Sequence, residues 1–247
     1  MREFLGYRIF EYDCLESTNT YLSERAKLGE GDKTVVIAKH QTGGRGRRGK
    51  SFFSPEGTGL YMSVLIRKAI LLDELGYLTP AVAVAAAHAI ERMGQKKCGI
   101  KWVNDIFIDG KKSAGILVET KCDFEKNALE YAVIGIGINI SEPQGGFPEE
   151  IKNTATAVFE AADDVKRVAL THELLLELEK ILNPFTPKRF MTEYKARSIL
   201  DGRTIEVITP SGVMQATAIG IDDNAHLVIE TPDGRQALSS GDVSVRM

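Results

Sequence analysis

The chain has 247 residues, of which 43% are hydrophobic and 26% charged, and its formal net charge is −3. This length accommodates one large domain, or a large domain followed by a small one. A net charge this close to zero gives no indication of a general affinity for nucleic acids or membrane surfaces.

No targeting or membrane-spanning segment is expected. The N-terminal stretch MREFLGYRIFEYD lacks the apolar core of a signal peptide, and the longest apolar run, residues 81–90, is too short to cross a bilayer. The three cysteines, Cys14, Cys98 and Cys122, are widely spaced and form no CxxC pair. Neither a disulfide framework nor a zinc site is therefore predicted, and a reducing cytoplasm fits this cysteine usage.

Helices and strands are interspersed along most of the chain. Residues 17–28 predict a helix that is capped by Ser17 or Thr18 and ended by Gly29. Residues 79–93 begin with Thr-Pro and continue rich in alanine, which is typical of a buried helix. Strands are further predicted over 34–39, 59–67 and 131–140, and helices over 171–182 and 187–198.

The pattern changes at about residue 199. Five short strand candidates follow, separated by turns that contain Pro-Ser-Gly, Asp-Asp-Asn, Pro-Asp-Gly and Ser-Gly; they cover 203–210, 213–221, 225–230, 235–240 and 242–246. Such spacing predicts a small all-β barrel. The expected organisation is thus an α+β domain over residues 1–198 followed by a barrel over 199–247.

Residues 43–51, GGRGRRGKS, match two phosphate-binding patterns, the P-loop and the dinucleotide fingerprint. Both patterns require a helix directly after the glycines, but the next residues, SFFSPEGTGLYMSV, contain a proline and glycines that a helix interior does not tolerate. We therefore predict a flexible loop between two strands, whose arginines, Arg45, Arg47 and Arg48, suit an anion such as a phosphate chain. Alternatively, the segment is a solvated surface loop.

An Asp-Gly pair at 109–110 separates two strand-like runs and predicts a two-residue hairpin turn. In a regular hairpin Phe107 faces Lys112 and Asp105 faces Ala114, so that all four side chains lie on one side of the sheet. Lys112 is then a diagonal neighbour of Asp105 and can bridge a carboxylate-derived group and a phosphate. Alternatively, its stem lies along the sheet while its head reaches water.

Together these segments resemble the biotin protein ligases, which attach biotin to a lysine of carboxylase subunits. The matching stretches are STN (17–19), QTGGRGRRGKSFFSPEGTGLYMSV (41–64), KWVNDIFIDGKKSAGILVE (101–119), GIGINI (135–140) and GDVSVR (241–246). They occur in the family's order and span nearly the whole chain. The resemblance implies an α+β fold with a mixed-sheet catalytic domain of the biotin/lipoate ligase type and a small C-terminal SH3-like β-barrel.

The resemblance also implies a two-step reaction with ATP and biotin as substrates. Biotin and ATP give biotinyl-5′-AMP with the help of Mg²⁺, and the biotinyl group then passes to a lysine of a biotin carboxyl carrier domain. Because the STN motif begins at residue 17, we expect no N-terminal DNA-binding domain and no nucleic-acid partner. The strand at 59–67 is expected to be an edge that can pair across a homodimer.

The site residues follow from the matched motifs. The resemblance implies catalytic roles for Lys112 and Arg47, and no residue is assigned as a metal ligand. Biotin-binding roles are implied for Ser17, Thr18, Asn19, Gln41, Arg45, Gly46, Arg47, Lys112 and Gly115. ATP-binding roles are implied for Arg48, Lys101, Asn104, Asp105, Asn139 and Arg246.

The sequence departs from the family pattern at four positions. Val103 stands in place of the usual proline, Lys50 of an arginine, Phe52 of a tryptophan and Ser113 of an apolar residue. Two other functions remain open. A lipoate–protein ligase has the same general fold, but its RRxSGGG-type stretch is absent, and a non-catalytic biotin sensor would not need the lysine and aspartate of the hairpin.

Overall fold

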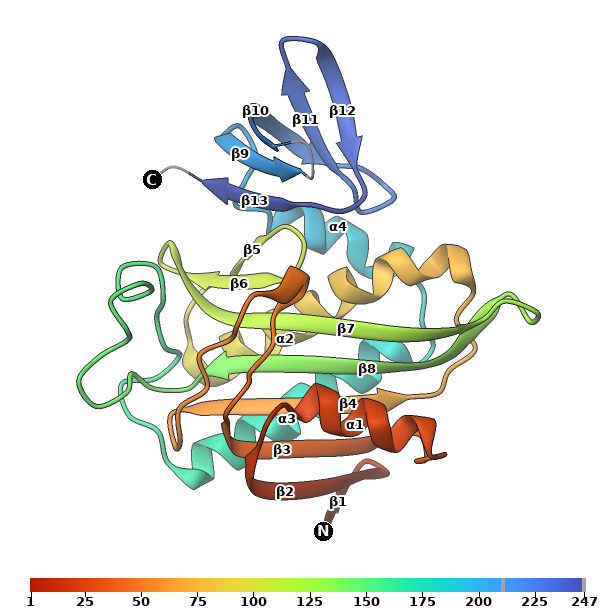
Figure 1. Cartoon of the computed structure of the whole chain (residues 1–247), viewed down its shortest axis with the longest axis vertical. Coiled ribbons are helices and arrows are strands. Elements are labelled where there is room, and N and C mark those ends of the chain that lie inside the picture. The colour runs from red at the N-terminus through yellow and green to blue at the C-terminus, as the bar shows by residue number, and fades with distance from the viewer. Residues whose placement is uncertain (210–211, 246–247) are drawn as a thin grey trace.

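The computed structural model describes residues 1–209 and 212–245. Its large sheet consists of β1 (Arg2–Phe4), β2 (Tyr7–Leu15), β3 (Thr34–Gln41), β4 (Gly59–Ile66), β5 (Gly99–Lys101), β6 (Asp105–Ile108), β7 (Lys111–Asp123) and β8 (Ala128–Asn139). The order is β1-β2-β3-β4-β8-β7-β6-β5, and all neighbours are antiparallel except the parallel pair β2 and β3. Figure 1 shows a smaller sheet stacked at one end of this mixed sheet.

Helices cover the two sides of the large sheet unequally. The helices α2 (Leu78–Gly94), α3 (Asp164–Leu182) and α4 (Lys188–Ala196) lie on one side, and the short α1 (Thr18–Lys27) lies on the other. Strand β3 serves both sides, because Val35 and Ile37 join the core beneath α2 while Val36 packs with Leu22 of α1. None of the helices within the described ranges is long and apolar enough to cross a membrane.

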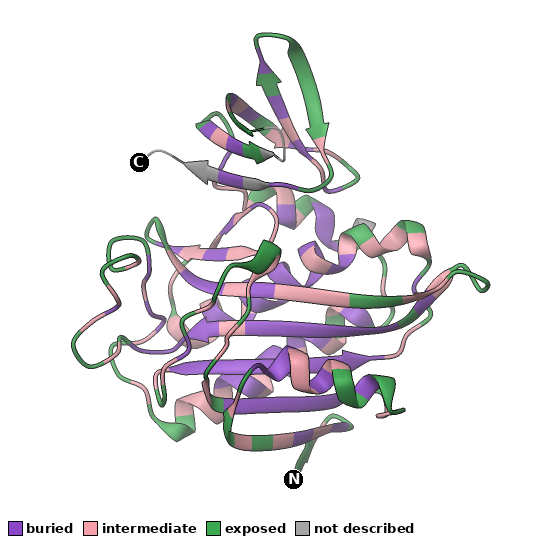
Figure 2. Cartoon of the chain, in the orientation of Figure 1, coloured by how far each residue is buried: buried purple, intermediate pink, exposed green. Residues whose placement is uncertain are grey.

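α1 covers only part of this side of the sheet, and a loop that follows β3 crosses β7 and β8 beside it (Figure 1). Figure 2 shows that β8 is mostly buried there and β7 mostly intermediate, while the crossing loop is largely exposed. The candidate site lies beneath this loop.

The predicted helices are present, with one difference in extent. α3 begins at Asp164, earlier than the expected residue 171, because the Asp163 side chain caps it by accepting a hydrogen bond from Lys166 N at 2.6 Å. The first turn is solvent-exposed, so it lacks the apolar periodicity that marks the rest of the helix. The β1–β2 hairpin was not predicted; its turn is formed by Leu5 and Gly6, both with positive φ.

The expectation that residues 59–67 form an edge strand is wrong. β4 pairs with β3 on one side and with β8 on the other, and all of its residues are buried. A strand with two neighbours has no free backbone groups to offer to a second copy of the chain. β4 is therefore part of the central sheet and cannot pair across a dimer.

The C-terminal strands are β9 (Thr204–Thr209), β10 (Gly212–Ile221), β11 (Leu227–Thr231), β12 (Gly234–Leu238) and β13 (Asp242–Val245). They form an antiparallel sheet in the order β12-β11-β10-β9-β13, which confirms the five predicted strands. β12 and β13 do not pair within the described residues, so the sheet is consistent with an SH3-like barrel that stays open. Trp102 Nε1 donates to Ala225 O at 2.9 Å and thereby ties this sheet to the large one. The boundary at residue 199 stays a prediction.

Candidate active site

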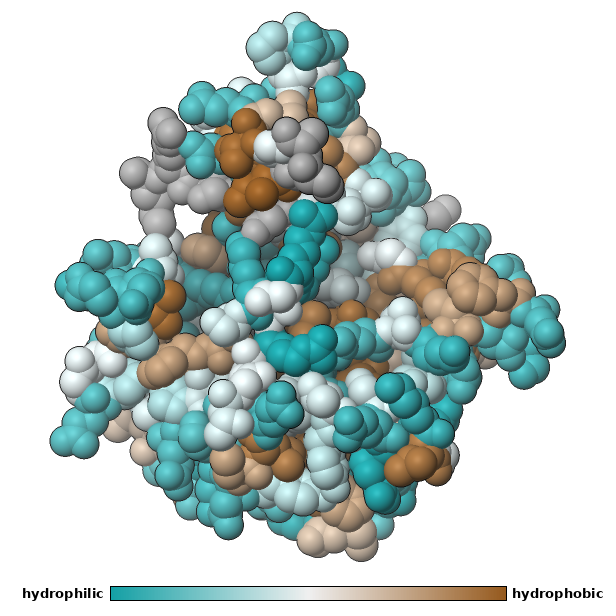
Figure 3. All heavy atoms as spheres, viewed as in Figure 1, coloured by the Kyte–Doolittle hydropathy of each residue, from teal (hydrophilic) through white to brown (hydrophobic). Residues whose placement is uncertain are grey.

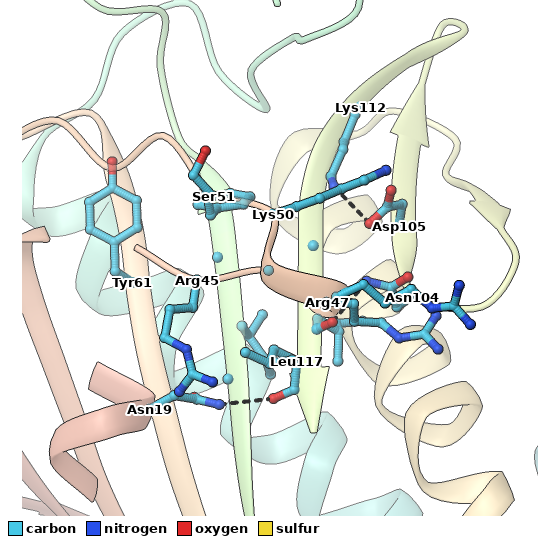
Figure 4. A pocket seen from close by; sticks show the side chains of 18 of the residues that line it. Asn19, Arg45, Arg47, Lys50, Ser51, Tyr61, Asn104, Asp105, Lys112 and Leu117 are labelled. Atoms are coloured by element: carbon cyan, nitrogen blue, oxygen red, sulfur yellow. Dashed lines mark hydrogen bonds and ion pairs between the residues drawn. The ribbon is translucent and has the colours of Figure 1, made fainter. Parts of the chain in front are cut away.

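A cleft opens where the N-terminus of α1, the arginine-rich loop, the β6–β7 hairpin and β8 meet (Figure 4). Gly241 and Val243 of the small sheet also line it. Figure 3 shows hydrophilic side chains gathered on this face between the two sheets. The cleft is lined by most of the predicted site residues, namely Ser17, Thr18, Asn19, Gln41, Arg45, Gly46, Arg47, Arg48, Lys101, Asn104, Asp105, Lys112 and Gly115.

The start of α1 orients one amide in the cleft. Ser17 is the N-cap, so Thr18 lies in the first turn with a backbone N–H that has no partner within the helix. Gln41 Oε1 accepts from Thr18 N at 2.9 Å and from Thr18 Oγ1 at 3.2 Å, and Gln41 Nε2 donates to Ser54 Oγ at 3.0 Å. The orientation of the Gln41 amide is therefore fixed from both ends.

Asn19 reaches across the sheet into a space that a glycine leaves open. Its Oδ1 accepts from the fully buried Ser63 hydroxyl at 2.6 Å, and its Nδ2 donates to Leu117 O at 3.2 Å. A Cβ on Gly135 would lie 2.2 Å from Asn19 Oδ1, so no larger residue fits at this position of β8. The glycine thus admits a polar side chain to the floor of the cleft.

A second glycine pair admits an aromatic ring. Gly115 and Gly137 face each other across β7 and β8. A Cβ on Gly137 would lie 2.6 Å from the Phe52 ring, and one on Gly115 would lie 3.4 Å from it. Phe52 also meets Tyr61 edge-on, with ring centroids 6.4 Å apart, and burial raises the pKa of Tyr61 to about 12. Phe52 therefore forms an apolar wall of the cleft.

The arginine-rich loop, residues 43–53, is a narrow hairpin. Gly46 N donates to Lys50 O at 2.7 Å, and Phe52 N donates to Gly44 O at 2.8 Å. A Cβ on Gly44 would lie 2.4 Å from Phe52 O, so the hairpin requires glycine there. At its tip Arg48 adopts a positive φ of 54°. Arg47 extends from this tip into the cleft, where it lies beside Asn104 (Figure 4).

Lys112 lies opposite Phe107 as predicted, and its Nζ is 2.7 Å from Asp105 Oδ1. The predicted pairing of Asp105 with Ala114 is wrong, because a β-bulge shifts the register and Asp105 pairs with Gly115. The bulge gives β7 one extra residue, Ser113, so Ala114 turns into the core on the opposite side. A Cβ on Gly115 would lie 3.3 Å from Lys112 Nζ, so the glycine gives the lysine its space.

The backbone of Lys112 is held from outside the hairpin as well. Lys112 N donates to Thr154 O at 2.7 Å, and Thr156 N donates to Lys112 O at 2.9 Å. This short parallel contact lies on the edge of β7 that faces away from β6. Lys112 is therefore fixed by a segment far along the chain.

Six cationic side chains line the cleft in the described structure, against the single carboxylate of Asp105; they belong to Arg45, Arg47, Arg48, Lys50, Lys101 and Lys112. Such an excess stabilises negative charge on a ligand, more strongly where water is displaced. The arrangement suits a substrate that brings phosphate groups and a carboxylate together.

Comparisons with known proteins agree with this geometry. Residues 11–139 match the Biotin/lipoate A/B protein ligase family, and residues 202–246 match the biotin protein ligase C-terminal domain. The chain is 35% identical to the bifunctional ligase/repressor BirA of Bacillus subtilis, over 98% of this chain and 75% of that protein. It is 32% identical to the biotin–[acetyl-CoA-carboxylase] ligase of Mycobacterium tuberculosis, over 92% of this chain and 85% of that protein. The chain belongs to the biotin protein ligase family.

A solved structure supports the same placement. The biotin protein ligase from Aquifex aeolicus, described in complex with biotin and ATP, superposes with a TM-score of 0.76 at 26% identity. The match covers 96% of this chain and 98% of that one. The mixed sheet with an appended small sheet is thus the fold of biotin protein ligases.

One predicted site residue within the described ranges does not line the cleft. Asn139 is buried, and its Nδ2 donates to Thr156 O at 3.1 Å, so it helps to hold the segment that fixes Lys112. The predicted Arg246 lies outside the described residues. Asn139 is therefore placed to support the site from behind.

Sequence reasoning missed Ser63, Ser54 and Glu119, all of which contact predicted site residues. Ser63 orients Asn19, Ser54 orients Gln41, and Glu119 receives hydrogen bonds from both Asn19 and Arg45. Glu119 ends the AGIL-x-E block, so its motif was visible, but nothing in the sequence indicated its partners.

Proposed function

We propose that this biotin protein ligase attaches biotin to one lysine of a carboxyl carrier domain, through biotinyl-5′-AMP formed from biotin and ATP. The observation that carries this proposal is a cationic cleft in which Lys112 and the arginine-rich loop face the same space. A fold match to a ligase described with biotin and ATP supports the choice of substrates.

In the first step a carboxylate oxygen of biotin attacks the α-phosphorus of ATP, and the bond to the pyrophosphate oxygen breaks. Negative charge gathers around one phosphorus during this exchange, and fixed cations stabilise it. The ammonium of Lys112 is positioned by Asp105 and is 36% exposed, so it can reach a ligand in the cleft. We assign this role to Lys112 and a closing role to Arg47, with Arg48, Lys101 and Asn104 towards the nucleotide.

Magnesium fits as a companion of the triphosphate. No group of three or more metal-binding side chains occurs within residues 1–209 and 212–245. Mg²⁺ usually binds through one or two carboxylates together with phosphate oxygens and water. Asp105, the carboxylate that lines the cleft, is the side chain that would hold it, and the ion would supply positive charge to the phosphates.

At the other end of the cleft the amides of Gln41 and Asn19 offer donors and acceptors whose orientations are fixed. A polar, uncharged ring such as the ureido group of biotin can pair with such amides, while Phe52 and Tyr61 contact its apolar parts. The pocket therefore supports a ligand with a polar head, an apolar middle and a carboxylate that points to Lys112.

In the second step the amine of the acceptor lysine, after losing a proton, attacks the acyl carbon of biotinyl-AMP, and AMP leaves. Water competes for the same mixed anhydride, so a loop that excludes water protects the intermediate. We place the acceptor on a carboxylase subunit, as the names of the relatives indicate, and the reaction in the cytoplasm, where ATP is supplied.

Mass spectrometry of a carboxyl carrier fragment tests the proposal. The fragment is incubated with the protein, ATP and Mg²⁺, together with either biotin or lipoate. One biotinyl group should appear on one lysine, and none should appear when that lysine is replaced by arginine. Transfer of lipoate in preference to biotin would make the chain a lipoate ligase, and tight biotin binding without any transfer would make it a sensor.

A further inference from the structure

Glu119 connects two parts of the cleft that belong to different elements. It lies on β7 on the same side of the sheet as Gly115 and Leu117, and its side chain is 32% exposed. Its Oε1 is 2.9 Å from Arg45 Nη2, and its Oε2 is 3.0 Å from Asn19 Nδ2. Both carboxylate oxygens are therefore engaged, one by the arginine-rich loop and one by the floor of the cleft.

The contact with Arg45 is a fork. Arg45 Nη1 lies 3.4 Å from Glu119 Oε2 and 3.3 Å from Thr20 Oγ1, in addition to the bond from Nη2. A two-pronged arginine–carboxylate pair fixes direction as well as distance. The guanidinium of Arg45 is thus bound to β7 and to the first turn of α1. Arg47, by contrast, extends into the cleft (Figure 4).

The position of the pair gives it a consequence for the loop. Arg45 stands at the base of the hairpin, where its backbone bridges Ser51 on the returning strand. Holding Arg45 against β7 therefore holds both arms of the hairpin over the cleft. The same carboxylate keeps the Asn19 amide turned so that its Oδ1 meets Ser63.

We propose that Glu119 is a positioning residue that latches the arginine-rich loop closed through Arg45 and orients Asn19. This proposal rests on the proposed function, because its purpose is to retain biotinyl-AMP until the acceptor lysine arrives. Glu119 touches neither phosphate nor carboxylate of the substrates; it acts through the two side chains that it holds.

The test compares Glu119→Gln with Glu130→Gln, which neutralises an exposed carboxylate on the neighbouring strand β8. Two rates are measured. The first is hydrogen exchange at the Gly46 and Phe52 amides of the ligand-free protein, and the second is the release of preformed biotinyl-AMP from the enzyme. Because the latch consists of charge-assisted hydrogen bonds, we expect both rates to rise about tenfold in Glu119→Gln and to stay unchanged in Glu130→Gln.

A double-mutant cycle separates a latch from a general loss of structure. If Glu119 acts through Arg45, then Arg45→Gln and the double variant should release biotinyl-AMP at about the same rate, while the thermal midpoints of all variants stay close. Exchange and release rates in Glu119→Gln equal to those of Glu130→Gln would overturn the latch. Absence of biotinyl-AMP synthesis by the unmodified protein would instead overturn the proposed function, and hydrogen exchange would still decide the latch.

Discussion

Replacing Lys112 by alanine should lower adenylate formation about 10³-fold. Lys112 Nζ lies 2.7 Å from Asp105 Oδ1, and the two side chains are 36% and 20% exposed, so the ammonium is a positioned and only partly hydrated donor. Removing one such donor typically costs about 10²–10³ in turnover. The substitution also removes the partner of the Asp105 carboxylate, which adds to the loss and favours the upper end of that range.

The assay is pyrophosphate release at saturating biotin and ATP, so that weakened binding does not mask the chemical step. Lys112→Arg should recover only part of the rate, since a planar guanidinium does not fit where Gly115 leaves room for a compact ammonium. Lys111→Ala is the matched control, because Lys111 is exposed beside the hairpin turn and points to the other side. Near-normal release by Lys112→Ala together with a large loss in Lys111→Ala would refute the assignment.

Two further outcomes follow from contacts on either side of the sheet. Gly135→Ala should lower the free energy of unfolding by about 1–3 kcal/mol and weaken biotin binding, because its Cβ would lie 2.2 Å from Asn19 Oδ1. Urea unfolding measures the first effect and calorimetry the second. Gly76→Ala is the control and should change neither quantity, because a Cβ there would have no atom within 4 Å. On the other side, hydrogen bonds from Arg197 hold the pKa of Glu91 below its ordinary value of 4.5. The ion pair therefore stabilises the fold above about the ordinary pKa, and this stabilisation is lost as the pH falls through the lowered pKa of Glu91. Glu91→Gln should make the thermal midpoint fall less steeply as the pH is lowered through the acid range. The same fall in the variant as in the unmodified protein would contradict the assignment.

The sequence predicts those parts of the fold whose signals are local. The Ala-rich helix α2 was predicted from its Thr-Pro start and its apolar content, and the five C-terminal strands from the turn residues between them. The first turn of α3 was missed because its residues are polar and solvent-exposed, and the cap at Asp163 is a weaker signal than a buried face. β4 was misplaced at an edge, although its continuous apolar sequence is typical of a strand with two neighbours.

The candidate site divides in the same way. Residues within motifs, such as Gln41 and Lys112, were found because each motif is contiguous. Glu119 was not assigned a role, since its partner Asn19 is 100 positions away in the sequence and no local pattern encodes that distance. A contact of this kind becomes visible only when two strands and a helix have been assembled.

The register of the catalytic hairpin shows why local rules reach a limit at this site. An Asp-Gly turn specifies the first two pairs correctly, and a regular ladder would then place Ala114 beside Lys112 in the cleft. The bulge at Ser113 breaks that ladder, and on the edge away from β6 the Lys112 backbone is held by hydrogen bonds with Thr154 and Thr156. The residue that faces the cleft next to Lys112 is consequently Gly115, which leaves the ammonium its space. The site places a lysine above a glycine by departing from the regular pairing, and the contacts that hold the lysine backbone come from a segment that no hairpin rule includes.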